Sequence, residues 1–233
     1  MSRRQGQERQ KFRTSRVLNI MFQDREKAGK LLAEKLKSLK RKNMAAAKFD
    51  LVLGITRGGV LVAREIAKIL SLPLDIIVVK KIGAPRNPEL AVGAVGPKAS
   101  VFWDEELLSN LHISLKERKG LLKIKKHEQE ELENKLSPKS KKRSLSEKNI
   151  ILADDGIATG ATVLAACKFL KREKVKSINL AIPVISKDTL GSIKKYFDRV
   201  VALEIADGFG AVGEFYVDFP QVEDETVIKI LSN

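Results

Sequence analysis

Residues 150–167 read IILADDGIATGATVLAAC, and their pattern indicates the fold class. This stretch joins an apolar run to a pair of acids, Asp154 and Asp155, and then to a turn of small residues that leads into a helical pattern. A buried strand that passes directly into a helix is the repeating unit of an open α/β sheet. Ligands of such sheets bind outside the carboxyl ends of the strands, where the two acids stand.

Apolar strand-like runs alternate with helical patterns on both sides of this stretch. The alternation predicts an α/β fold, an open and mostly parallel twisted sheet with helices on both faces. Residues 206–233 add aromatic residues and end in a short helical pattern. Strands are expected at 49–55, 74–80, 149–153, 177–185 and 199–205, and helices at 24–42, 60–70, 114–136, 161–173 and 187–197.

The segment 81–98 breaks this pattern. It is rich in glycine and proline and has no period that would mark a core-facing strand or helix. We expect a long loop or an irregular hairpin there, and long loops of compact domains are often functional or mobile.

Composition excludes several classes of protein. The chain has 233 residues and no apolar run long enough to span a membrane. Its single cysteine, Cys167, excludes an internal disulfide. The polar, basic start lacks the apolar stretch of a secretory signal. These features indicate a cytoplasmic protein that folds around one substantial core.

The net charge of +15 favours anionic partners. Much of it lies in two stretches, an N-terminal arm at 1–20 and a linker at 137–148. Two interpretations stay open: the cations are solvated charge on flexible segments, or they contact a polyanion such as RNA or DNA.

Two strand ends carry glycine-bearing turns that run into helices. In the first, Gly58 and Gly59 allow the backbone to approach a ligand, and Arg57 supplies a permanently charged planar donor. In the second, residues 159–162 stand where a helix begins, and the free N–H groups of a helix start attract phosphate. Either turn could be chain geometry alone, but the two together suit a ligand with phosphate at both ends.

The acids between these turns allow several roles. Asp154 and Asp155 could cap a strand or the turn that follows it. They could also accept hydrogen bonds from a diol or face a divalent cation that neutralises phosphates. A sugar phosphate would satisfy both the acids and the helix start.

A nucleoside triphosphatase is excluded as an explanation of the acid pair. An apolar strand that ends in two acids resembles a Walker B element, which requires a phosphate-binding loop with a lysine elsewhere. Neither glycine turn has that lysine, and Ala161 stands at its place in the second turn. A dinucleotide-binding glycine fingerprint is also absent from the sequence.

ILADDGIATGATV, residues 151–163, is similar to the phosphoribosyl pyrophosphate signature of type I phosphoribosyltransferases. Three more segments, at 53–67, 78–95 and 209–219, resemble a stand-alone phosphoribosyltransferase-like family of the GLPRGGVPVA type. The resemblance covers residues 22 to 231. It implies a phosphoribosyltransferase-like domain over 21–233, with a lid at about 81–100, a helical insertion at 114–136 and a small C-terminal hood.

The resemblance also implies roles for individual residues. The acids would bind the ribose hydroxyls, the second turn the 5-phosphate and the first turn the pyrophosphate. Magnesium would arrive mainly on substrate oxygens, with Asp154 and Asp155 as indirect ligands. The residues implied for pyrophosphate are Thr56, Arg57, Gly58 and Gly59, and those for the sugar phosphate are Asp154, Asp155, Gly156, Ala158, Thr159, Gly160, Ala161 and Thr162.

The catalytic groups implied are Arg57, Lys81 and Glu89. Arg57 and Lys81 would stabilise the departing pyrophosphate. Hypoxanthine–guanine enzymes of the superfamily have an aspartate near the purine where this chain has Ala158, so proton transfer must come from elsewhere, and Glu89 is the candidate. The aromatic residues 209–219 belong either to the core or to a wall that stacks on the acceptor base, with Tyr216 as the candidate.

The favoured hypothesis is an enzyme that transfers 5-phosphoribosyl to a nitrogenous, purine-like base and releases pyrophosphate. Its partners would be the donor, the base and a second copy of the chain in a homodimer. The alternative is a regulator that senses phosphoribosyl pyrophosphate and binds RNA or DNA through the basic stretches. A catalytically silent scaffold fits least, because the acids and glycines are intact.

Overall fold

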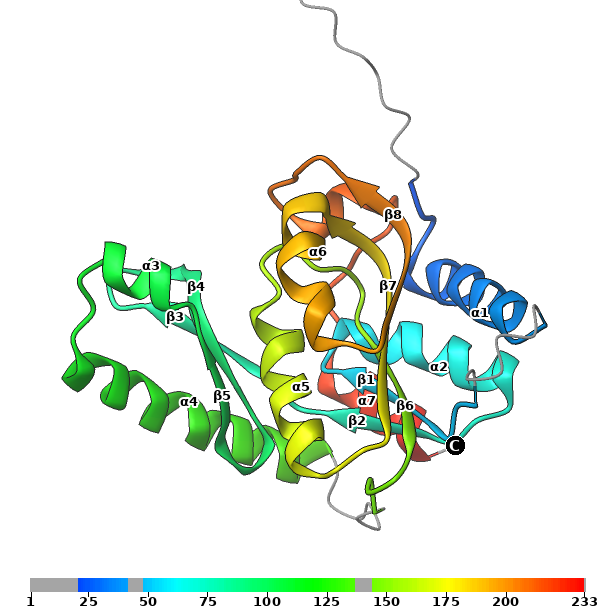
Figure 1. The fold of residues 1–233 in the computed structure, drawn as a ribbon, viewed down its shortest axis with the longest axis horizontal. Coiled ribbons are helices and arrows are strands. Elements are labelled where there is room, and N and C mark those ends of the chain that lie inside the picture. The colour runs from blue at the N-terminus through cyan, green and yellow to red at the C-terminus, as the bar shows by residue number, and fades with distance from the viewer. Residues whose placement is uncertain (1–20, 42–47, 137–143, 233) are drawn as a thin grey trace, which may run out of the picture.

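The computed structural model describes residues 21–41, 48–136 and 144–232. Its main sheet has five strands, all parallel, in the order β2-β1-β6-β7-β8 (Figure 1). The predicted open parallel sheet is therefore confirmed. Its strands are β1 (Leu51–Ile55), β2 (Leu74–Ile77), β6 (Asn149–Ala153), β7 (Ser177–Ser186) and β8 (Arg199–Ala206).

Helices cover both faces of this sheet, as the alternation of strands and helices predicts. Successive side chains of β6 point to opposite faces. Ile150 and Leu152 pack with α5, whereas Ile151 and Ala153 pack with α1 and α2. One face carries α1 (Arg25–Arg41) and α2 (Gly58–Leu70), and the other carries α5 (Ala161–Arg172) and α6 (Lys187–Ile193), which continues into a short 3-10 turn, η2 (Lys194–Tyr196).

A second, antiparallel sheet stands beside the main sheet and forms an arm with two helices (Figure 1). The arm has its own apolar cluster around Ile82, Val92 and Leu108. Among the described residues, no helix is long and apolar enough to cross a membrane. The arm consists of β3 (Lys80–Ala84), β4 (Asn87–Gly96), η1 (Pro97–Ala99), β5 (Ser100–Trp103), α3 (Glu105–Asn110) and α4 (Leu115–Leu136).

Residues 81–98 lie in a hairpin, which decides between the two predicted alternatives, a long loop and an irregular hairpin. The expectation of one strand over 74–80 is wrong, because β2 ends at Ile77 and β3 begins at Lys80. Glycines hide the strand pattern because they sit where strands approach closely. A Cβ on Gly83 would lie 2.1 Å from the Pro88 carbonyl oxygen, and one on Gly93 2.5 Å from that of Phe102. The register also shifts beside Gly83, which interrupts the alternation of side chains.

The C-terminal segment covers one end of the sheet. Residues 207–223, which we call the hood, contain the short helix η3 (Val212–Phe215) and pair with the chain just before α1: the Phe22 amide donates to the Phe215 carbonyl at 2.7 Å. Helix α7 (Asp224–Ser232) follows and contacts α2 and α4. The basic arm 1–20 and residues 137–143 of the basic linker lie outside the described residues.

Candidate functional site

The two glycine-bearing loops lie side by side at the carboxyl edge of the sheet. β1 and β6 are adjacent and parallel, with Gly54 opposite Ala153. The chain leaves β1 through residues 56–59, which we call the β1–α2 loop and which include the first two residues of α2, Gly58 and Gly59. It leaves β6 through residues 154–160, the β6–α5 loop. The predicted juxtaposition of the acid pair with both loops is therefore present in the structure.

Direct contact with the acid pair explains the two glycines of the β1–α2 loop. A Cβ on Gly58 would lie 1.8 Å from Asp155 Oδ2, and a Cβ on Gly59 would lie 2.8 Å from Asp154 Cα and 3.0 Å from its Oδ1. No side chain fits at either position without displacing an acid. The glycines thus allow the loop to pass against the two carboxylates, which adds a structural reason to the predicted approach of a ligand.

Asp154 is buried, with 8% of the residue exposed. Its Oδ1 accepts a hydrogen bond from the Asp155 amide at 2.9 Å. Burial raises the pKa of Asp154 well above its ordinary value, and the charge of Asp155 raises it further, while the positive charge of Lys81 on β3 opposes both. Burial and the like charge of Asp155 together disfavour the ionised form of Asp154.

Asp155 has a dedicated cation, Arg25 at the start of α1. Arg25 Nε donates to Asp155 Oδ2 at 2.7 Å. The same guanidinium donates to the Pro220 carbonyl at 2.8 Å and lies 3.5 Å from the centre of the Phe219 ring. Arg25 therefore ties α1, the hood and the acid pair together, and its charge balances that of Asp155.

Neighbouring elements hold the β6–α5 loop through its main chain. The Ile157 amide donates to the Val184 carbonyl at 2.9 Å. The Tyr216 hydroxyl donates to the Asp155 carbonyl at 2.6 Å, and the Thr189 hydroxyl of α6 donates to the Ala158 carbonyl at 2.5 Å. These contacts fix the path of the loop before any ligand is bound.

The start of α5 offers unpaired amides to an anion. Gly160 is the N-cap residue with φ +81°, a conformation that favours glycine, and no side chain caps the helix. Ala161 is buried, Thr162 is half-buried and Thr159 is exposed. The first-turn N–H groups and the helix dipole are thus available to an anion, and the two threonines of this turn lie close to the helix start in the sequence.

Arg57 is the N-cap residue of α2, and the peptide bond that precedes it, from Thr56, is cis. Its Nε donates to Asp224 Oδ1 on α7. Lys135 of α4 donates to the other oxygen of the same carboxylate at 2.8 Å. Hydrogen bonds to Lys135, with a further contribution from Arg57, hold the pKa of Asp224 below its ordinary value against the effect of burial.

Comparison with known proteins assigns this arrangement to a family. The phosphoribosyl transferase domain matches residues 21–220. The chain belongs to that family. The resemblance of the acid-pair stretch to type I phosphoribosyltransferases is confirmed by this match and by the parallel sheet that carries the stretch.

Named relatives agree with the assignment. A Mycobacterium tuberculosis H37Rv protein called "Putative phosphoribosyl transferase" and its counterpart in strain CDC 1551 are each 35% identical to the chain over 216 residues. The match covers 91% of this chain and 46% of either relative, so the chain spans about half their length. The crystal structure of TT1426 from Thermus thermophilus is 34% identical, covers 91% of this chain and 98% of its own, and superposes with a TM-score of 0.74.

The remaining predicted site residues of this phosphoribosyl transferase domain lie at different distances from the acids. Lys81 is exposed on β3, and its charge acts on Asp154. Glu89 is exposed in β4, close to the turn at residues 85–86 that joins β3 to β4. Glu89 therefore belongs to the arm and is separated along the hairpin from the end that carries Lys81.

Tyr216 lies in the core, the first of its two predicted alternatives. It is 5% exposed, and its ring centre lies 5.4 Å from that of Phe22 and 4.7 Å from that of Phe219. Burial and the nearby charge of Asp155 raise the pKa of its hydroxyl, so the hydroxyl stays a hydrogen-bond donor at neutral pH. Tyr216 thus supports the acid pair through its hydrogen bond to the Asp155 carbonyl.

Sequence reasoning missed three charged residues of the site, Arg25, Asp224 and Lys135. The partners of the Arg25–Asp155 and Arg57–Asp224 pairs are 130 and 167 residues apart in the chain. Arg25 and Lys135 lie in helices that sequence periodicity predicted, but periodicity does not say which distant acid a surface cation meets. The signal that the sequence offered for these three residues was their position at the ends of helices.

The donor set fits a magnesium ion that is held mainly by a ligand. Within residues 21–41, 48–136 and 144–232, no group of three or more histidine, cysteine or acidic side chains could enclose a metal ion. Asp154 and Asp155 supply carboxylate oxygens of the kind that magnesium prefers, and two carboxylates commonly suffice when phosphates complete the coordination.

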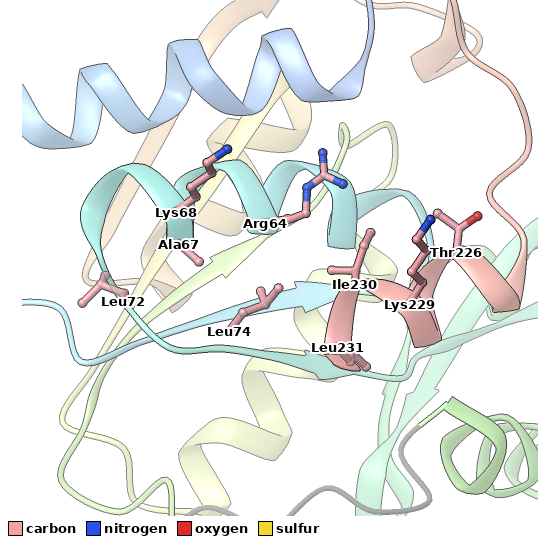
Figure 2. Close-up of a pocket in the computed structure, with 9 residues that line it drawn as sticks. All are labelled: Arg64, Ala67, Lys68, Leu72, Leu74, Thr226, Lys229, Ile230 and Leu231. Carbon is pink, nitrogen blue, oxygen red and sulfur yellow. The ribbon is translucent and has the colours of Figure 1, made fainter. Parts of the chain in front are cut away.

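A separate cavity of about 670 Å³ lies between α2 and α7, over the edge strand β2 (Figure 2). Its floor is apolar, and the charged ends of Arg64, Lys68 and Lys229 point to one side of it. None of the predicted site residues lines this cavity. The lining residues are Arg64, Ala67, Lys68, Leu72, Leu74, Thr226, Lys229, Ile230 and Leu231.

Proposed function

We propose that this protein transfers a 5-phosphoribosyl group from phosphoribosyl pyrophosphate to a nitrogenous base and releases pyrophosphate. The observation that carries the proposal is the acid pair at the start of the β6–α5 loop, which lies against the β1–α2 loop at the same edge of the sheet. A sugar with a phosphate at one end and a pyrophosphate at the other matches that arrangement of anion, diol and anion sites. Membership of the phosphoribosyl transferase family supports the same donor.

The β6–α5 loop would hold the sugar phosphate. Amides at the start of α5 and the hydroxyls of Thr159 and Thr162 would donate to the 5-phosphate oxygens. Asp154 and Asp155 would accept hydrogen bonds from the ribose hydroxyls, with Asp155 Oδ1 on the side away from Arg25. Because the loop is already fixed by its neighbours, the donor would bind with little loss of chain entropy.

The β1–α2 loop would hold the leaving group. Thr56, Gly58 and Gly59 would face the pyrophosphate with their main chain, and Arg57 and Lys81 would neutralise its charge. Magnesium, when bound, would neutralise pyrophosphate oxygens and reach the acid pair from the ligand side.

The reaction breaks the bond between the anomeric carbon and the pyrophosphate oxygen, and the pyrophosphate leaves with the bonding electrons. A nitrogen of the base forms the new bond to that carbon and gives its proton to Glu89, the proposed proton-transfer group, or to water. The protein would contribute position and charge complementarity, and closure of the arm over the site would exclude water.

The acceptor is proposed as purine-like on the resemblance alone. Ala158 has no side chain that could exchange a proton with the base, and Glu89, which is exposed on β4, stays the proposed proton-transfer group. A homodimer and a cytoplasmic location remain predictions from the sequence. The alternative of a nucleic-acid-binding regulator rests on the basic stretches, most of which lie outside the described residues.

The test is pyrophosphate release from the donor and Mg²⁺ in the presence of a panel of purine and pyrimidine bases. We expect release with at least one base, and at least a 100-fold loss of donor affinity in the Asp154→Asn/Asp155→Asn variant. The matched control is Glu130→Gln/Glu131→Gln, which removes two adjacent carboxylates that are 53% and 66% exposed on α4.

Two outcomes would overturn the proposal. One is a folded wild-type protein that binds the donor but releases no pyrophosphate with any base. The other is a donor affinity that falls equally in the acid-pair variant and in the control. Donor-dependent retardation of RNA or DNA without pyrophosphate release would favour the regulator instead.

A further inference from the structure

One carboxylate joins the β1–α2 loop to two distant parts of the chain. Asp224 Oδ1 accepts from Arg57 Nε, and Asp224 Oδ2 accepts from Lys135 Nζ at 2.8 Å. Arg57 begins α2, Lys135 lies in the last turn of α4, and Asp224 is the first residue of α7. The arm and the C-terminal helix therefore meet at the arginine that the proposed reaction uses.

Packing around the carboxylate keeps this junction in place. Leu136, next to Lys135, is 2% exposed and packs with Val60 of α2 and with Val227 of α7. The side chain of Asp224 is 12% exposed, compared with 33% for Arg57 and 52% for Lys135. The acid is thus the most buried member of the three, and both cations that it binds are partly exposed.

The charges of the three residues leave a net positive charge for a ligand. A carboxylate that paired with Arg57 alone would cancel the charge of the guanidinium and weaken its attraction for an anion. Lys135 balances the carboxylate from its other oxygen, so these three residues keep one positive charge in excess. Glu225, the acid 3.8 Å from Lys135, is 76% exposed, and solvent screens its charge. Two cations on one acid allow the arginine to be oriented without being neutralised.

The hydrogen-bonding capacity of the guanidinium is also kept. An arginine has five N–H groups in a rigid fork, and Arg57 uses the one on Nε for Asp224. The donors on its two terminal nitrogens form a second edge of the fork. That edge matches the spacing of two oxygens on a phosphate.

We propose that Asp224, balanced by Lys135, is a positioning residue that holds the Arg57 guanidinium for the pyrophosphate of the donor. This inference rests on the proposed function and deepens it, because it assigns the orientation of the leaving-group arginine to the C-terminal helix. Asp224 touches no reacting atom, and its effect on the reaction passes through Arg57.

The experiment measures binding of inorganic pyrophosphate with Mg²⁺ to the full chain by calorimetry, in a cycle of Arg57→Met, Asp224→Asn and the double variant. We expect about a 10-fold loss of affinity in Asp224→Asn, the loss that accompanies one charge-assisted hydrogen bond. In the Arg57→Met background, Asp224→Asn should cause no further loss. The thermal midpoint of each variant shows whether it is folded.

Two control variants separate orientation from general charge. Glu225→Gln removes the adjacent acid, which is 76% exposed and lies 3.8 Å from Lys135, and should leave affinity within about 2-fold of the wild type. Lys135→Met should weaken binding by about 3-fold or more, because the unbalanced carboxylate then cancels the charge of Arg57. Lys126→Met, a cation on the exposed face of the same helix, should not.

The outcomes distinguish this inference from the proposed function. Tighter binding in Asp224→Asn would mean that the acid competes with the ligand for Arg57, and an equal loss with or without Arg57 would mean a purely structural role. Either overturns the inference. If Arg57→Met weakens binding but Asp224→Asn does not, the inference fails and the proposed pyrophosphate loop stands. If Arg57→Met has no effect, the loop assignment itself fails.

Discussion

The two loops that meet at the acid pair are held in different ways. The β1–α2 loop is anchored by a charged side chain, because Arg57 reaches Asp224 on the last helix of the chain. The β6–α5 loop is anchored through its main chain: hydroxyls of Tyr216 and Thr189 donate to its carbonyls, and its Ile157 amide pairs with β7. One loop presents a cation and the other presents amides.

The difference corresponds to the two ends of the proposed donor. The 5-phosphate stays attached to the sugar throughout the reaction, and a rigid set of amides suits a group that does not change. The pyrophosphate separates from the sugar and gains negative charge as it leaves, and a partly exposed arginine that Asp224 holds in place can neutralise that charge. Variants in both loops test whether donor binding depends on the rigidity of the β6–α5 loop and pyrophosphate binding on the charge of the β1–α2 loop.

The largest effect is expected for Gly58→Ala, which affects both loops where they touch. The new Cβ would lie 1.8 Å from Asp155 Oδ2 and 2.9 Å from Arg25 Nε, so the loop or the ion pair must move. We expect a loss of about 3 kcal/mol in the free energy of unfolding and at least a 100-fold loss of donor affinity. Chemical denaturation and calorimetry measure the two quantities.

The control for this variant is Gly120→Ala on α4, where a Cβ would meet no atom within 4 Å. Alanine should stabilise that exposed helix position by about 0.5–1 kcal/mol and leave donor affinity unchanged. If Gly58→Ala were as stable as the wild type and bound the donor normally, the glycine would not serve the acid pair.

A smaller effect is expected for Gly160→Ala, which tests the rigid loop alone. Gly160 has φ +81°, and its Cβ would lie 3.0 Å from Ile193. The left-handed conformation costs an alanine about 1–2 kcal/mol, and a shifted α5 start should weaken donor binding about 10-fold. Binding of pyrophosphate, which uses the other loop, should be unchanged.

Gly191→Ala is the matched control for the rigid loop. Gly191 lies within α6, and a Cβ there would meet nothing within 4 Å. This alanine should be neutral or stabilising. Equal losses of pyrophosphate and donor binding in Gly160→Ala would show that the two loops are not independent.

The sequence could predict those parts of the site whose interacting residues lie close together along the chain. The acid pair, Gly160 and the helix start were predictable because their chemistry is contained within residues 154–162. The sheet followed from local hydrophobic patterns. Arg25 and Asp224 could not be predicted, because each acts on a loop more than a hundred residues away in the chain.

Two other predictions were limited by patterns with more than one meaning. Glycines in the arm obscured its strands, since Gly83 and Gly93 serve contacts between strands and not turns. The aromatic residues of the hood fitted either a core or a base-stacking wall. Only the burial of Tyr216 at 5% exposure decided for the core.

The third prediction concerns Asp154→Asn, which separates stability from binding at the acid pair. Folding raises the pKa of Asp154 through burial and the charge of Asp155, so folding favours the protonated acid. The stability from this group is present below the unfolded pKa of about 4 and is lost as pH rises through the folded pKa. Asparagine keeps the acceptor oxygen for the Asp155 amide without the charge.

Asp154→Asn should therefore match the wild type near pH 4 and exceed it by about 1 kcal/mol above pH 7, with a thermal midpoint higher by about 2–4 °C. Donor affinity should fall at the same time. Thermal melts across this pH range provide the measurement. A variant less stable than the wild type at pH 8 would contradict the physical account of the acid pair.

The smallest effect is expected for Tyr216→Phe, which removes one of the hydroxyl contacts that make the β6–α5 loop rigid. The Tyr216 hydroxyl donates to the Asp155 carbonyl at 2.6 Å, and its ring packs against Phe22 and Phe219. Phenylalanine keeps the ring contacts, so the cost should be about 0.5–1 kcal/mol. Donor affinity should fall by about 2- to 5-fold, and pyrophosphate affinity should not change. A larger loss for pyrophosphate than for the donor would reverse the assignment of rigidity to one loop and charge to the other.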